Sequence, residues 1–323
     1  MSLHPELETF LELITLGRMS GQNKPLHALS VEQARVVFEQ TSLVLDPDPP
    51  KSITVTAVLI PTRDGKTIRA RLYRKTGKVS EKLPVILYFH GGGYVVGSLD
   101  SHEGICRRLA WYGDFAVLAP EYRLAPEYRW PVAVEDALDT ANWLSKQGAA
   151  FDLDSAHVVV AGDSAGATLA TTLAITSVKH PDWMEVKPIA QLLFYPVTDT
   201  TRLRASHRDY GKGYLLESET LEWFYQHYVE TDQRSHWTIS PLLISDIPIL
   251  PPTYIRLAKF DPLHDEGSAY AQLLQTHGTC VQLTVENALT HDYLRMGGIV
   301  DEVDNIYKET ILWLKSIQSQ LNF

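Results

Sequence analysis

The sequence predicts an α/β fold in which helices cover both faces of a mostly parallel central sheet. From residue 84 onward, short unbroken apolar runs have the texture of strands that are buried on both faces. Segments with helical periodicity separate these runs, and this alternation is typical of a parallel sheet. The chain of 323 residues is 45% hydrophobic and 21% charged, so it has enough apolar material to bury a large core.

Two helices are expected before the sheet begins. Apolar residues recur at helical spacing over residues 5–18 and again over residues 30–45. Ser30 and Gln33 form a capping-box pattern at the start of the second segment, which indicates where that helix begins.

A β-hairpin is expected next. Residues 52–61 and 67–74 have the alternation of half-buried strands, and Asp64-Gly65 between them is a common turn pair. The sheet should therefore have an antiparallel edge.

The remaining strands and helices follow in alternation. The five expected strands are the runs PVILYFH, DFAVLAP, AHVVVAG, PIAQLLFYP and TYIRLAKF. The clearest helices between them cover residues 102–112, 131–147, 164–176 and 264–277. A last strand, CVQLTVEN, and a last amphipathic helix, DEVDNIYKETILWLKSI, complete the pattern.

One connection is far longer than the others. Almost 60 residues separate the strand that ends near Tyr195 from the strand that starts near Thr253, and they are rich in aromatic side chains. These are Tyr210, Tyr214, Trp223, Phe224, Tyr225, Tyr228 and Trp237. So long a connection is usually functional, for instance a lid over a site, although the rings could equally form the core of a helical insertion. We expect a helical cap segment at residues 1–50 and a main domain at 51–323 with a cap insertion at about 200–240.

Composition argues against several classes of partner. The formal net charge is −10, and the sequence has no block of lysine and arginine that could bind along a phosphate backbone. Nucleic acid is therefore not an expected partner. The first 20 residues carry acidic side chains and no sustained apolar stretch, which is unlike a signal peptide. No apolar run reaches about 18 residues, so membrane insertion is not expected either.

The two cysteines, Cys106 and Cys280, are too few for a disulfide framework and have no partners at metal-ligand spacing. They are expected to be buried thiols in a reducing cytoplasm, and no metal or other cofactor is expected.

The stretch AGDSAGA, residues 161–167, contains the first candidate catalytic residue. The pattern GxSxG is weak alone, but here it follows a buried strand and opens a helical segment. In that setting Gly162 and Gly166 allow the strand and the helix to approach closely, and Ser164 is exposed at the carboxyl edge of the sheet. Asp163 belongs to the same turn. Ser164 is therefore a candidate nucleophile.

A serine hydroxyl needs a base to remove its proton and a carboxylate to orient that base. Asp261 follows the strand TYIRLAKF, and His291 lies in the loop after the last strand, so both sit at the ends of later strands. Asp199 is a second candidate acid. Among the other histidines, His264 is too close to Asp261 in the chain, His157 heads the strand that leads to the serine, and His236 lies in the insertion.

A glycine run supplies candidate oxyanion donors. His90-Gly91-Gly92-Gly93-Tyr94 follows the strand PVILYF, and backbone N–H groups without side chains can approach a reacting oxygen closely. With the N–H of Ala165, those of Gly92 and Gly93 would complete an oxyanion hole. A phosphate-binding loop is not expected, because no lysine follows the glycines.

Five stretches together resemble one known family. HGGGY at 90–94, EYRLAPE at 121–127, GDSAG at 162–166, DPLHDEG at 261–267 and His291 are similar to the motifs of the hormone-sensitive lipase family of α/β-hydrolases, which includes bacterial acetyl esterases and other carboxylesterases. The similarity runs from about residue 50 to the carboxyl end.

The resemblance implies an α/β-hydrolase fold with a helical cap, and a triad of Ser164, Asp261 and His291 that needs no cofactor. It implies oxyanion donors at Gly92, Gly93 and Ala165. Residues expected near a substrate pocket are Tyr94, Tyr195, Tyr214 and Tyr293. A homodimer is a further expectation from the family.

The expected activity is hydrolysis of short- to medium-chain acyl esters, small molecules, through an acyl-enzyme intermediate. Two alternatives from other classes stay open: a non-catalytic binding protein on the same scaffold, and an amidase or peptidase that uses the same triad.

Two departures from the family pattern have consequences. The family usually has His-Gly-Phe or His-Ala-Phe at the base, whereas this chain has His291-Asp292-Tyr293. The carboxylate of Asp292 either raises the pKa of His291, if it lies within about 6 Å, or points to solvent without effect. Tyr94 stands where Phe or Trp is common, and its hydroxyl is expected to face water.

Overall fold

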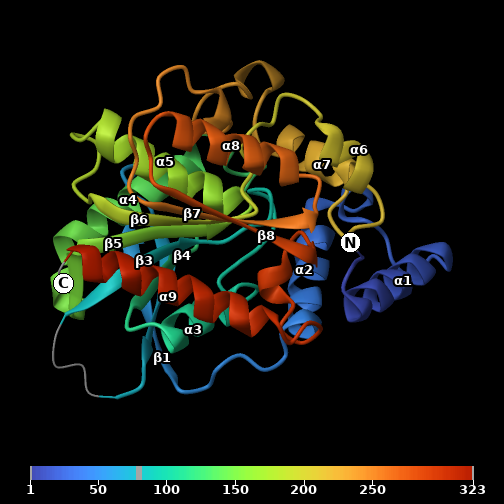
Figure 1. Cartoon of the computed structure of the whole chain (residues 1–323), viewed down its shortest axis with the longest axis horizontal. Coiled ribbons are helices and arrows are strands. Elements are labelled where there is room, and N and C mark those ends of the chain that lie inside the picture. The colour runs from blue at the N-terminus through green and yellow to red at the C-terminus, as the bar shows by residue number, and fades with distance from the viewer. Residues whose placement is uncertain (1, 78–81, 322–323) are drawn as a thin grey trace.

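One sheet forms the middle layer of the molecule. In the computed structural model, which describes residues 2–77 and 82–321, eight strands pair in the order β1-β2-β4-β3-β5-β6-β7-β8 (Figure 1). They are β1 (Ile53–Pro61), β2 (Thr67–Lys75), β3 (Leu83–Phe89), β4 (Ala116–Pro120), β5 (Leu153–Asp163), β6 (Pro188–Phe194), β7 (Thr253–Phe260) and β8 (Val281–Thr290). β1 pairs with β2 and β2 with β4 in antiparallel fashion, and all later pairs are parallel. The predicted hairpin and the predicted parallel sheet are both confirmed.

The α-helices of the described residues are α1 (Pro5–Met19), α2 (Val31–Leu45), α3 (Glu103–Tyr112), α4 (Val132–Gln147), α5 (Ala165–Lys179), α6 (Ala205–Tyr210), α7 (Ser218–Tyr228), α8 (His264–Thr276) and α9 (Val303–Leu321). Short 3₁₀ turns lie at Leu26–Ala28, Gly148–Phe151, Thr231–Gln233, Pro241–Leu243 and Tyr293–Arg295. The predicted capping box is present at α2, where Ser30 and Gln33 exchange hydrogen bonds between side chain and backbone.

The sheet separates two hydrophobic cores. Successive residues of a strand point to opposite faces, so Val85 and Leu87 of β3 belong to one core while Ile86 and Tyr88 belong to the other. Helices α4, α5 and α8 contribute to the first core, and α3 and α9 contribute to the second. Figure 1 shows these two groups of helices on opposite faces of the sheet.

The amino-terminal helices and the long insertion meet at one end of the sheet. α6 and α7 lie in the connection between β6 and β7, and Figure 1 shows them beside α1 and α2. The 3₁₀ turn at Leu26–Ala28 packs against α7. Two segments far apart in the sequence therefore meet beyond the strand ends.

The fold corrects one expectation about cysteine. Cys106 is buried in α3, but Cys280 is exposed, because it lies between α8 and β8, the last strand of the sheet.

No helix among the described residues is long and apolar enough to span a bilayer.

The turn from β5 into α5 is closely packed against the end of β3. A β-carbon on Gly166 would lie 2.0 Å from the carbonyl oxygen of Phe89 and 2.5 Å from that of His90. A β-carbon on Gly162 would lie 2.4 Å from the backbone of Gly166. Only glycine fits at both positions, and α5 can therefore start directly over the end of β3.

We predict that Gly166→Ala destabilises the protein by about 1–3 kcal/mol or more, because the new methyl group meets backbone atoms that cannot move aside cheaply. Gly267→Ala is the matched control, since Gly267 is also in the first turn of a helix and its β-carbon would meet only the end of the Leu257 side chain, at 2.5 Å. Urea unfolding of both variants measures the difference. Equal losses would show that the backbone approach at Gly166 is not the limiting contact.

Candidate active site

Ser164 occupies the turn between β5 and α5 in a strained backbone conformation. Its φ is +52° and its ψ is −119°, a region that residues with side chains rarely adopt. The next residue, Ala165, begins α5, so its N–H has no partner within the helix and lies beside the serine. The sequence predicted this arrangement from GxSxG between a buried strand and a helix.

His291 lies between Ser164 and Asp261. Its Nε2 is 3.0 Å from the hydroxyl oxygen of Ser164, and its Nδ1 is 2.8 Å from an oxygen of Asp261. The other oxygen of Asp261 accepts a hydrogen bond of 2.8 Å from the N–H of Leu263. All three side chains of this group are buried, although they come from three separate strand ends.

The other candidates from the sequence lie elsewhere. The carboxylate of Asp199 bonds Arg202 and Arg204. His157 bonds Asp154, and His264 contacts Asp265. The geometry thus brings together the residues that sequence reasoning preferred.

The glycine run follows β3 and curves toward the serine. Gly92 and Gly93 have φ values of +109° and +59°. A β-carbon on Gly93 would lie 2.2 Å from the ring of Phe224, and one on Gly92 would lie 2.2 Å from the carbonyl oxygen of Val96. Both glycines line the same cavity as Ser164, Ala165 and His291.

The rest of the run is held by buried polar contacts. Asp163 accepts hydrogen bonds from the N–H of Gly91 at 2.9 Å and from the hydroxyl of Tyr88 at 2.5 Å. His90 stacks on Tyr122, with ring centroids 4.3 Å apart, and burial lowers the pKa of His90 to about 3. A neutral His90 therefore serves packing, and Asp163 ties the glycine run to the serine turn.

Opposing effects act on the pKa of His291. Burial lowers it, but the charge and hydrogen bond of Asp261, followed by the charges of Asp292 and Asp163, raise it more, so the net shift is upward. The carboxylate of Asp292 does not face solvent freely, because Arg295 pairs with it through two nitrogens. The first of the two outcomes expected for Asp292, a raised pKa of His291, is the one that the structure supports.

Arg295 is a residue that sequence reasoning missed. It also donates a hydrogen bond to the hydroxyl of Ser42, and its guanidinium lies 4.0 Å from the centre of the Phe38 ring. Both partners belong to α2, more than 250 positions away in the chain. No local motif marks such a contact.

The residues near Arg295 include the one cluster of possible metal ligands found among the described residues. Ligand atoms of His102, Asp163 and Asp292 lie within 4.8 Å of one another. Arg295 already pairs with Asp292, and His102 lies 3.4 Å from Asp163. The guanidinium of Arg295 therefore already supplies a positive partner to one of the two carboxylates, Asp292.

A cavity of about 660 Å³ opens in front of Ser164. Its walls are largely apolar and come from the amino-terminal helices and from the insertion. Lining residues include Leu29, Val37 and Phe38 on one side and Leu216, Leu221 and Phe224 on the other. The volume lies within the usual range for small-molecule sites.

The four tyrosines expected near a pocket have different locations. Tyr94 lines the cavity, but it is 1% exposed and its ring stacks on Tyr228, so its hydroxyl does not face water as expected. Tyr195, Tyr214 and Tyr293 lie outside the cavity wall. Tyr195 packs behind His291, with ring centroids 4.6 Å apart, Tyr293 packs edge-on against Tyr195, and Tyr214 stacks on Phe260.

Comparison with known proteins agrees with this geometry. Residues 86–295 match the family described as the alpha/beta hydrolase fold. An ethyl acetate hydrolase of Pseudomonas putida is 43% identical over 306 residues, which cover 94% of this chain and 96% of that protein. The carboxylic ester hydrolase LipN of Mycobacterium tuberculosis is 36% identical over 77% of this chain and 67% of its own length. The solved structure of a hyperthermophilic esterase from the archaeon Pyrobaculum calidifontis superposes with a TM-score of 0.89 at 33% identity, and 99% of each chain is covered.

The similarity to these esterases extends over the whole fold and not only over the motifs. The chain therefore belongs to the hormone-sensitive lipase family of the alpha/beta hydrolase fold and is a carboxylic ester hydrolase.

Proposed function

We propose that the protein hydrolyses short- to medium-chain acyl esters through a Ser164–His291–Asp261 triad and an acyl-enzyme intermediate. The observation that carries this proposal is the position of His291, which is within hydrogen-bond reach of both Ser164 and Asp261. Asp261 accepts a hydrogen bond from the Nδ1–H of the neutral imidazole, which leaves the lone pair of Nε2 free to accept the proton of the serine hydroxyl.

The reaction then follows from the positions of these groups. As Ser164 attacks the ester carbonyl carbon, its proton passes to Nε2 of His291, and the carbonyl oxygen becomes an oxyanion. The N–H groups of Gly92, Gly93 and Ala165 are the proposed donors to that oxyanion. His291 returns the proton to the leaving alcohol, and a water activated by the same histidine hydrolyses the acyl-enzyme.

The proposed acyl length rests on the cap and on one relative. In this proposal the helical segment at residues 1–50 and the insertion at about 200–240 act as a cap, and both contribute apolar side chains to the walls. A relative that is 43% identical is named for ethyl acetate, whose acyl group has only two carbons. We infer that the cap closes around short and medium chains.

We predict that Ser164→Ala and His291→Ala each lower kcat on p-nitrophenyl acetate by on the order of 10⁴-fold or more, because each removes a member of one reacting unit. Ser164→Ala keeps a β-carbon at the strained position, so folding should not change. His157→Ala is the control, since His157 lies toward the opposite end of β5 and bonds Asp154. Stopped-flow rates and circular dichroism give the measurement, and wild-type rates in either triad variant would contradict the proposal.

The acyl-length preference is tested with p-nitrophenyl esters from acetate to laurate. We expect kcat/KM to be highest at or below about eight carbons and roughly tenfold or more lower for laurate, in line with the relative that is named for ethyl acetate. A preference for laurate would contradict the proposed substrate range without affecting the triad.

For Asp292→Asn we expect the acid limb of the kcat/KM profile to move to lower pH. The Asp292 carboxylate raises the pKa of His291, so removing its charge lowers that pKa and keeps the base unprotonated further into the acid range. Glu309→Gln is a suitable control, because Glu309 lies on α9 and pairs with Arg256 of β7 and not with a group of the proposed triad. An unmoved acid limb in Asp292→Asn would show that Arg295 fully neutralises the carboxylate.

A further inference from the structure

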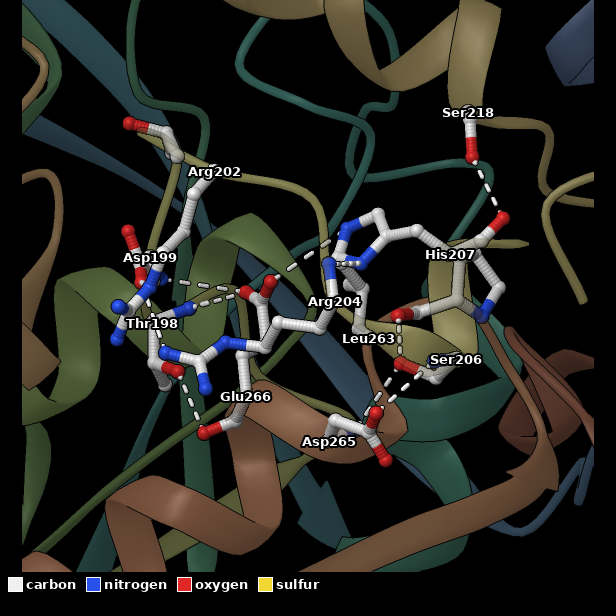
Figure 2. Close-up of polar contacts among 12 residues, drawn as sticks. Thr198, Asp199, Arg202, Arg204, Ser206, His207, Ser218, Leu263, Asp265 and Glu266 are labelled. Atoms are coloured by element: carbon white, nitrogen blue, oxygen red, sulfur yellow. Dashed lines mark hydrogen bonds and ion pairs between the residues drawn. The ribbon is translucent and has the colours of Figure 1, made fainter. Parts of the chain in front are cut away.

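A buried polar cluster joins the start of the insertion to the first turn of α8 (Figure 2). α8 begins at His264, three residues after Asp261. The insertion side of the cluster runs from Thr198, after β6, to His207 in α6. The cluster lies outside the reacting groups, but it is attached to the loop that carries the proposed acid.

Ser206 makes the contacts nearest to that acid. Its hydroxyl donates a hydrogen bond of 2.6 Å to the carbonyl oxygen of Pro262, and the N–H of Asp265 donates to the same hydroxyl at 3.2 Å. The N–H of Ser206 in turn donates to the Asp265 carboxylate at 2.9 Å. Ser206 is 2% exposed, so water does not readily replace these bonds.

Glu266 holds the same turn of α8 from the other side. One of its carboxylate oxygens accepts hydrogen bonds from the N–H of Thr198 at 2.7 Å and from that of Asp199 at 3.3 Å. The hydroxyl of Thr198 donates to the backbone carbonyl of Glu266 at 2.9 Å. The second carboxylate oxygen lies 3.7 Å from Nε2 of His207, and burial raises the pKa of Glu266 to about 8. Figure 2 shows Asp265 next to Ser206 and Glu266 next to Thr198, so two neighbouring residues of one turn of α8 contact the insertion.

The loop between β7 and α8 is thereby fixed on the carboxyl side of Asp261. One Asp261 oxygen is bonded to the N–H of Leu263, and the carbonyl of Pro262 between them is bonded to Ser206. The second Asp261 oxygen is then directed to His291. A shift of the loop would therefore change the distance between Asp261 and His291.

We propose that Ser206 is a positioning residue for Asp261, through which the insertion holds the acid in line with His291. This inference rests on the proposed triad. Because Leu215, Leu216 and Leu221 of the same insertion line the cavity, the segment that shapes the pocket also aligns the acid.

The carboxylates around His291 make its pKa a measure of how Asp261 is aligned. Asp261 faces it from the loop after β7, Asp163 lies at the end of β5, and Asp292 lies on the loop of His291 itself, where Arg295 pairs with it. Of these three carboxylates, Asp261 contributes the largest upward effect on the pKa of His291. A misaligned Asp261 should therefore lower that pKa, which a purely structural loss elsewhere would not do.

The main experiment compares Ser206→Ala with Ser218→Ala on p-nitrophenyl acetate. Ser218 donates its hydroxyl to the carbonyl of His207 at 3.2 Å, so it bonds the same insertion without reaching the acid loop. For Ser206→Ala we expect kcat to fall about tenfold with KM within roughly twofold, and the acid limb of kcat/KM to move to lower pH. Ser218→Ala should change neither. Identical behaviour of the two variants, or a loss of kcat in Ser206→Ala with an unmoved acid limb, would overturn the proposal.

A double-mutant cycle separates this inference from the proposed function. If Ser206 acts through Asp261, then Ser206→Ala should cost less than about twofold in an Asp261→Asn background. Additive losses would overturn the positioning role. If Asp261→Asn alone were as active as wild type, the triad itself would fail.

Thr198→Val serves if Ser206→Ala does not fold, since it removes the hydroxyl bond to Glu266 on the other side of the same turn. It should move the acid limb in the same direction as Ser206→Ala, and an unmoved limb would count against the proposal. Ser206→Thr keeps a hydroxyl, so its kcat and the position of its acid limb should be close to those of the wild type and not to those of Ser206→Ala. A folded Ser206→Thr variant that behaves like Ser206→Ala would also count against the proposal.

Discussion

The structure of the site depends on one close backbone contact, the approach of Gly166 to the carbonyls of Phe89 and His90. This contact places the start of α5 over the end of β3. The serine turn and the glycine run consequently face one cavity, and Asp163 then bonds the N–H of Gly91 across the same contact. Without it, the nucleophile and the proposed oxyanion donors would belong to independent loops, and preorganised donors are worth far more than mobile ones.

Features that a short stretch of sequence encodes could be predicted. The strand positions follow from apolar runs, and Ser164, Asp261 and His291 each stand directly after such a run, where a parallel sheet brings its carboxyl ends together. Contacts between distant segments could not be predicted in this way. Arg295 reaches α2, and Tyr195 packs against His291, because the sheet brings together segments whose spacing in the sequence carries no signal.

Asp292 illustrates how a departure from a family pattern can be both tolerated and used. Its φ is +70°, in the left-handed region, and aspartate is among the residues with side chains that tolerate this region best. The carboxylate adds negative charge near His291, while Arg295 compensates for its burial. Asp292 and Arg295 should therefore be considered as a unit.

The paired charges around the triad also explain how a buried histidine remains a usable base. Burial alone lowers the pKa of His291, which would weaken it as a proton acceptor. Three carboxylates reverse that effect, but two of them have other partners: Asp163 bonds Tyr88 and Gly91, and Asp292 bonds Arg295. Of the three carboxylates, only Asp261 hydrogen-bonds the imidazole, so it is the one that directs Nδ1 of His291. The position of the loop that carries Asp261 is consequently where the rest of the fold can most directly affect the reaction.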